Sequence, residues 1–234
     1  MSDMRSHFHQ EMADLEQTLL GVADQAEQMV GMAVDAVCIP DMELAARVVQ
    51  LDARIDRTYL DVHDRWMELM ARQQPMASDL RMMSVILHLN TTLERMGDQC
   101  VNIAKIAQVT FGLPRSERIV AQIREMGDLV RPMIRTGVEA LVRRDLDEAR
   151  LLPAMDEPID RLNRNMYKEV VDCAGDQGVL EWATRMMIVS RAIERIGDQV
   201  VDIAEQTAFL LTGEMMEFNE EGMAAATDRN DDVG

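Results

Sequence analysis

The sequence predicts an all-α protein built from two tandem, pseudo-symmetric three-helix bundles, with six long antiparallel helices in total. Two observations predict this fold class. Aromatic residues make up only 3% of the chain and methionine occurs 21 times, so the core must come mainly from aliphatic side chains and Met, a composition that helices accommodate. In addition, the stretch ERMGDQCVNIA at 94–104 returns as ERIGDQVVDIA at 194–204. Self-similarity at a long, fixed offset indicates duplicated structural units.

The first unit is expected to span residues 1–112 and to contain three helices. Apolar side chains recur at helical spacing over about 8–38, 42–72 and 78–111, which is the pattern of helices with one buried face. Asp41 directly precedes the second of these stretches, so its carboxylate is the expected N-cap.

The second unit, 113–213, repeats the plan with helices expected over about 117–144, 158–172 and 180–211. Pro132 falls inside the first of these helices, where the missing N–H and the ring should bend it. Glycines commonly end helices, and the expected stops are Gly175, Gly178 and Gly213.

The segment 214–234 loses helical periodicity and is acidic, which predicts a disordered tail.

Bulk properties exclude several classes of protein. The net charge of −18 and the lack of any basic run argue against nucleic-acid binding. The three cysteines are far apart, so neither a disulfide framework nor a thiolate metal site is indicated. No run approaches the roughly 20 apolar residues that span a bilayer, so we expect a cytoplasmic protein that meets membranes only through partners.

Acidic motifs accompany both copies of the repeat. Each unit has a D-x-x-x-D motif on its middle helix and an E-x-x-x-D motif, extended by one further turn, on its third helix. Residues four apart share one face of a helix, and these two helices are neighbours in an antiparallel hairpin. The candidate site residues are Asp52, Asp56, Glu94, Asp98 and Asn102 in the first unit and Asp156, Asp160, Glu194, Asp198 and Asp202 in the second.

Packing two acidic stripes together requires a positive charge between them, because like charges at i and i+4 destabilise a helix by about 0.2–0.5 kcal/mol per pair. One interpretation is pairing with nearby arginines, such as Arg191 with Glu194, in surface salt bridges worth about 0–1 kcal/mol. The other is a cluster of metal ions bound by carboxylate oxygens, which suit Mg, Mn, Ca or iron.

Gly97 and Gly197 directly precede the central aspartates of the repeat. Glycine inside a helix costs about 1 kcal/mol relative to alanine and marks a close approach by another group. The sequence leaves open whether that group is a second helix or a metal site.

The alternative function is a carboxylate-bridged metal-binding or metal-storage helical protein with redox activity. Ferritin-like enzymes of that kind need a Glu-x-x-His motif on each of two helices, and the sequence has none. His63, seven residues after Asp56, is the histidine that could face the site. No phosphate-binding loop or nucleophile motif occurs either, so we expect no enzymatic activity. A purely structural scaffold is a third alternative.

Together with RQQPMASDLRMM at 72–83 and LLTGE at 210–214, these motifs make the chain resemble the PhoU family of phosphate-transport accessory proteins over residues 8–214. The resemblance implies two three-helix bundles, a cytoplasmic homodimer and a negative regulator of phosphate uptake and of the phosphate-starvation response. The implied partners are the ATPase subunit of a phosphate ABC transporter and a sensor histidine kinase.

The resemblance also implies divalent or trivalent metal ions, such as iron, Mg, Mn or Zn, bound by the carboxylates of the acidic motifs. Two positions depart from the family pattern. Asp202 stands where the family often has Asn, so the second site is expected to be more negative. Pro158 lies inside the second D-x-x-x-D motif and fits only a first helical turn, which weakens the assignment of Asp156 as a ligand.

Overall fold

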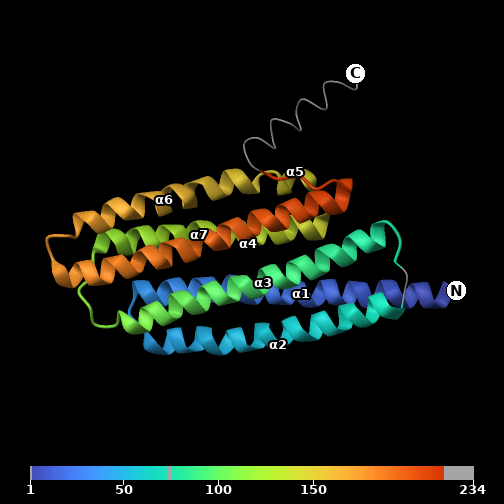
Figure 1. The fold of residues 1–234 in the computed structure, drawn as a ribbon, viewed down its shortest axis with the longest axis horizontal. Coiled ribbons are helices and arrows are strands. Elements are labelled where there is room, and N and C mark those ends of the chain that lie inside the picture. Colours follow the sequence, from blue (N-terminus) through green and yellow to red (C-terminus); the bar gives the residue numbers. More distant parts are fainter. Residues whose placement is uncertain (1, 73–74, 219–234) are drawn as a thin grey trace, which may run out of the picture.

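The computed structural model describes residues 2–72 and 75–218 and confirms the all-α prediction, since no strand occurs among these residues. Six long helices and one short one follow each other along the chain (Figure 1). They are α1 (Ser2–Cys38), α2 (Met42–Arg72), α3 (Ser78–Val109), α4 (Glu117–Arg143), α5 (Leu146–Ala149), α6 (Leu152–Asp172) and α7 (Gln177–Thr212).

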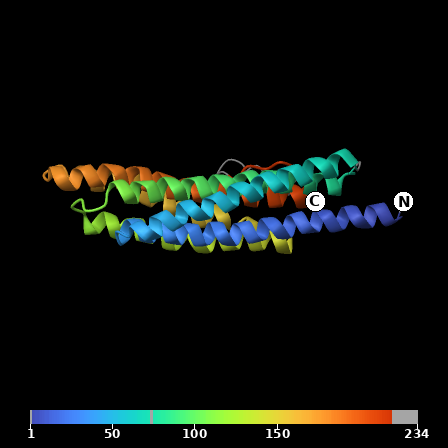
Figure 2. The ribbon, with the colours of Figure 1, turned by 90° about the horizontal axis from the view of Figure 1, so that it is seen from below.

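The long helices form two three-helix bundles. Helices α1, α2 and α3 pack against one another, as do α4, α6 and α7, and the two bundles meet through the α3–α7 and α1–α4 contacts. The result is one elongated body in which the long helices run side by side (Figure 1 and Figure 2). The third helices of the two units, α3 and α7, therefore lie next to each other across the interface between the bundles.

Aliphatic and methionine side chains fill the core as the composition predicts. Leu15, Met83, Met96 and Ile103 are fully buried within a single hydrophobic cluster that runs through both bundles. Trp182 is the largest fully buried side chain. This continuous core explains why two units of about one hundred residues behave as one body.

Capping residues set several helix boundaries. Asp41 caps α2 as predicted, because its Oδ1 accepts hydrogen bonds from the backbone N–H groups of Glu43 and Leu44, both at 2.9 Å. Gly213 ends α7 as predicted, with a left-handed φ of 79° that favours glycine.

The predicted start of α7 is wrong, because the helix begins before Leu180. Asp176 is the N-cap, and its Oδ1 accepts from the backbone N–H groups of Gly178 at 3.0 Å and Val179 at 3.3 Å. The capping carboxylate satisfies donors that the first turn leaves open. Gly178 therefore lies inside the first turn of α7 and is not a stop.

The predicted start of the middle helix of the second unit is also wrong. Helix α6 begins at Leu152, with Pro153 in its first turn, where the missing N–H removes no helical hydrogen bond. Pro158 consequently lies in the interior of α6, and Asp156 is a helical residue. Helix α4 likewise runs through Pro132 without interruption.

The start of the predicted tail lies against the second bundle. The backbone N–H of Phe218 donates to Oε1 of Glu205 at 2.7 Å, and the Phe218 side chain packs partly buried against the core. The rest of the predicted tail, 219–234, lies outside the described residues. Among the described helices, none is long and apolar enough to cross a membrane.

Candidate metal centres

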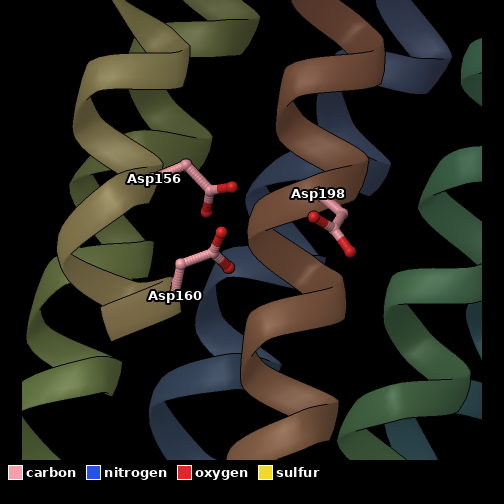
Figure 3. A group of neighbouring side chains, drawn as sticks. All are labelled: Asp156, Asp160 and Asp198. Atoms are coloured by element: carbon pink, nitrogen blue, oxygen red, sulfur yellow. The ribbon is translucent and has the colours of Figure 1, made fainter. Parts of the chain in front are cut away.

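Three aspartates from two helices converge in the second bundle. Asp156 and Asp160 project from α6, and Asp198 projects from α7 (Figure 3). One carboxylate oxygen from each lies within 4.8 Å of the other two. The facing carboxylates that the sequence predicts between the middle and third helices are therefore present, and we call these three residues the α6–α7 cluster.

A glycine on the opposing helix makes room for the innermost aspartate. A Cβ atom built on Gly197 would overlap Oδ1 of Asp156, and it would lie 3.7 Å from Cδ1 of Ile159. The close approach that the glycine permits is thus that of a carboxylate from the neighbouring helix, which occupies the space that a side chain on α7 would need.

The first bundle repeats this arrangement. A Cβ built on Gly97 would lie 2.6 Å from Oδ1 of Asp52 and 3.6 Å from Cδ1 of Ile55. The same three residue types meet in the same way at both sites, so the internal repeat extends from the sequence to individual atomic contacts.

Burial and like charges destabilise the ionised form of Asp156. The residue is 7% exposed, and its Oδ1 is buried without a hydrogen-bond partner. Burial, followed by repulsion from Asp160, Asp198 and Glu194, raises the pKa of Asp156 to about 7. An unpaired buried carboxylate is costly, so this group needs either a proton or a cation.

Glu194 extends the α6–α7 cluster and has a protein counterion. It is 6% exposed and forms the predicted ion pair with Arg191, while its Oε2 is buried without a partner. Burial, together with the charge of Asp198, raises the pKa of Glu194. The salt-bridge interpretation is therefore present here, but it satisfies only part of the carboxylate.

Four carboxylates gather between α2 and α3 in the first bundle. Burial, and then repulsion from Asp56, Asp98 and Glu94, raises the pKa of Asp52 to about 6, while Lys105 opposes the shift. Oδ1 of Asp52 is buried without a partner. We call the four carboxylate residues Asp52, Asp56, Glu94 and Asp98 the α2–α3 cluster. Within residues 2–72 and 75–218, the α6–α7 cluster alone brings three such ligand atoms within 4.8 Å of one another.

The residues that extend the two stripes have different surroundings. Asn102 lines a small surface pocket between α3 and α7, together with Ile188 and Arg195. Asp202 shares a groove with the α6–α7 cluster. Burial raises the pKa of Asp202, whereas His88 and Arg95 of the neighbouring bundle lower it.

The groove around the α6–α7 cluster includes residues that sequence analysis missed. Its volume is about 1120 Å³, and the additional lining residues are Arg150, Pro153, Ala154, Glu157, Arg164, Val201, Glu205, Glu217 and Phe218. Glu205 lies three residues after Asp202, so helical spacing could have identified it. Glu217 and Phe218 come from a segment without periodicity, and no sequence pattern indicates their position.

The donor atoms of both clusters fit a hard metal ion. All the converging groups are carboxylate oxygens, which are the ligands that Mg²⁺, Mn²⁺, Ca²⁺ and iron prefer. The buried oxygens of Asp52, Asp156 and Glu194 that lack partners would gain one on ion binding. Metal binding itself stays a prediction.

Comparisons with known proteins identify relatives that match most of the chain. The PhoU domain model matches residues 19–107 and 123–207, once in each bundle. The phosphate-specific transport system accessory protein PhoU homolog of Clostridium acetobutylicum is 30% identical over 218 residues, covering 92% of this chain and 99% of that protein. The homolog of the same description from Pseudomonas putida is 31% identical and covers 88% of this chain and 81% of its own length.

Solved structures share the fold. The crystal structure of PhoU from Pseudomonas aeruginosa has a TM-score of 0.84 and 29% identity, over 88% of this chain and 100% of that chain. The phosphate transport system regulatory protein PhoU from Streptococcus pneumoniae has a TM-score of 0.80 and 27% identity, over 89% of this chain and 98% of that chain.

Proposed function

The chain belongs to the PhoU family, and from that premise we propose that it is a non-enzymatic regulatory adaptor of a phosphate transport system, acting in the cytoplasm. The observation that carries this proposal is the match of the family model to both bundles. The names of its relatives, which describe accessory and regulatory proteins of phosphate transport, support it.

In detail, the adaptor restrains phosphate uptake and keeps the phosphate-starvation response off when phosphate is plentiful. Its partners are the ATPase subunit of a phosphate ABC transporter and a sensor histidine kinase. An adaptor without chemistry of its own acts by binding one conformation of a partner more tightly than another. The net charge of −18 favours partner surfaces that are basic.

Metal ions are part of the proposal, held by the two clusters of carboxylates. In the first bundle the binding groups are Asp52, Asp56, Glu94 and Asp98, with Asn102 beyond them. In the second they are Asp156, Asp160, Glu194, Asp198 and Asp202. A bound divalent or trivalent ion would supply the positive charge that these carboxylates lack and so hold α2 against α3 and α6 against α7. Since an ion that binds only the folded state stabilises it, the clusters couple metal supply to the rigidity of the docking surface.

We further propose that the protein is a homodimer. Leu60 and Met67 support this, because they lie seven residues apart on one face of α2 and are 61% and 53% exposed. Large exposed apolar side chains at heptad spacing are typical of helix–helix contact between subunits. Sedimentation equilibrium of the full chain gives the mass, and a monomer at micromolar concentration contradicts this part.

Complementation of a deletion strain tests the regulatory role. Deletion is expected to derepress a phosphate-starvation reporter at high phosphate, and the wild-type chain should restore repression. A variant with Asp98→Asn and Asp198→Asn removes one charge from each cluster and should restore it poorly. Asp61→Asn, an exposed aspartate on the outside of α2 that pairs with Arg65, is the matched control and should restore repression fully.

Two further outcomes bear on the adaptor proposal. Unchanged reporter activity in the deletion strain contradicts it. Turnover of peroxide or oxygen by the metal-loaded protein would instead support the metal-storage or redox alternative. Among the described residues, no histidine joins a converging ligand group, His63 included, which favours the adaptor.

A further inference from the structure

We propose that the two carboxylate clusters are inequivalent, so that the α6–α7 cluster binds the first hard divalent cation and binds it more tightly than the α2–α3 cluster. This inference rests on the proposed metal-binding role and adds an order of loading to it. The protein then passes through a singly loaded state in which the ion lies in the second bundle. Four differences between the clusters carry the inference.

The first difference is how far each cluster is already assembled. Asp156, Asp160 and Asp198 each offer an oxygen within 4.8 Å of the others, and no other such group occurs in the part of the chain that the structure describes. Ligands that already converge lose less conformational freedom when an ion binds. The α2–α3 cluster must draw its carboxylates together first.

The second difference is burial of the ligand atoms. Asp156 is 7% exposed and Glu194 is 6% exposed, and each has a buried oxygen without a hydrogen-bond partner. In the α2–α3 cluster Asp52 also has a buried oxygen without a partner, but the residue as a whole is only partly buried, and the corresponding glutamate, Glu94, has no such atom. Attraction between an ion and a carboxylate is stronger where less water screens it, so the second cluster gains more from an ion.

The third difference is charge at equivalent positions of the repeat. Asn102 corresponds to Asp202, and Lys105 corresponds to Glu205, at the offset of one hundred residues. Lys105 lies close enough to Asp52 to interact with it electrostatically, whereas Asp202 and Glu205 both line the groove of the α6–α7 cluster. A cation therefore meets repulsion at one cluster and additional attraction at the other.

The fourth difference is a contribution from the C-terminal segment. The backbone N–H of Phe218 bonds to Oε1 of Glu205 at 2.7 Å, and Glu217 lines the same groove as Asp198. The chain thus adds a carboxylate to the rim of the second cluster from beyond the end of α7, whereas the chain after α3 continues through a short connection into α4.

Arginines oppose binding at the second cluster, but only weakly. Arg191 pairs with Glu194, and Arg164 contacts Asp160 at 3.6 Å. The first unit has no arginine at either equivalent position, because Thr91 corresponds to Arg191 and Leu60 corresponds to Arg164. Arg164 can keep its shorter 2.7 Å contact with Glu157 after releasing Asp160. Both arginine side chains are more than half exposed, so water screens part of the charge with which they oppose an incoming ion. Preassembly and charge therefore decide the order.

Calorimetric titration of Mn²⁺ into the metal-stripped full-length protein tests the order. The wild type should show two classes of site whose dissociation constants differ by about tenfold or more. Asp156→Asn with Asp198→Asn should remove the tight class. Asp52→Asn with Asp98→Asn, the matched pair in the first bundle, should remove the weak class and leave the tight one within about twofold.

A reciprocal exchange of charges provides a test that does not depend on deleting ligands. Asn102→Asp with Lys105→Glu should tighten the weak class severalfold, and Asp202→Asn with Glu205→Lys should weaken the tight class by a similar factor. Two equal classes, or loss of the tight class in the Asp52 and Asp98 variant, overturn the inference while metal binding itself stands. Absence of Mn²⁺ binding at either cluster overturns the metal-binding role as well.

Discussion

Replacing Asp156 by asparagine should change how the stability of the metal-free protein depends on pH. In the folded state the pKa of Asp156 rises from 3.8 to about 7, so between these values the folded protein binds a proton that the unfolded chain has released. The contribution of Asp156 to the free energy of unfolding is therefore fully present below pH 3.8 and is lost as pH rises through 7. At 1.36 kcal/mol per pKa unit the loss reaches at most about 4 kcal/mol, and the neutral amide of the variant should remove it.

Urea unfolding of metal-stripped protein at pH 4.5 and pH 8 measures this effect. The comparison uses the difference between the two pH values for each protein, because any cost of burying the asparagine amide is the same at both. The wild type should lose more stability than Asp156→Asn by roughly 2–4 kcal/mol. Excess Mn²⁺ at pH 8 should stabilise the wild type more than Asp156→Asn, because the variant keeps only the α2–α3 cluster intact. An identical pH dependence in the two proteins refutes the view that Asp156 is a buried carboxyl held among like charges.

Three further predictions concern other residues of the two clusters. Alanine at Gly97 or Gly197 should lower the melting temperature, because the new Cβ displaces the buried oxygen of an aspartate. In the control Gly21→Ala nothing lies within 4 Å of the new Cβ, so this change should stabilise α1 by up to about 1 kcal/mol. An equal gain at all three positions contradicts the close approach. Asp52→Asn should flatten the pH dependence of metal-free stability mainly between pH 4 and 6, the interval between the ordinary pKa of 3.8 and about 6, as urea titrations at intermediate pH would show. Arg191→Ala should increase Mn²⁺ affinity at the α6–α7 cluster by about fivefold or more, since it removes a cation that competes for the buried carboxylate of Glu194. An unchanged or weaker affinity by calorimetry would show that the pair with Glu194 supports the site.

Local chemistry in the sequence was sufficient for most of the fold. The repeat at 94–104 and 194–204 predicted two three-helix bundles, and the structure has two. Asp41 begins α2 and Gly213 ends α7, as capping rules predict. Spacing of four residues placed the acidic residues of each helix on one face, and the two faces do meet. These properties depend on neighbours within one or two turns, so a linear pattern contains them.

Tertiary packing decided the features that no local pattern contains. Pro158 suggested the start of a helix, but Pro153 already occupies the first turn of α6, and the helix continues through Pro158. Asn102 and Asp202 continue their stripes in sequence, yet each lies beside the opposite bundle because α3 packs on α7. The segment that ends at Phe218 joins the groove through a hydrogen bond to Glu205. Residue spacing is enough to show which carboxylates share a face of a helix. Their burial, their counterions and the difference between the two clusters depend on the packing of helices that are distant in the chain, because desolvation and Coulomb energies depend on the distances between such helices.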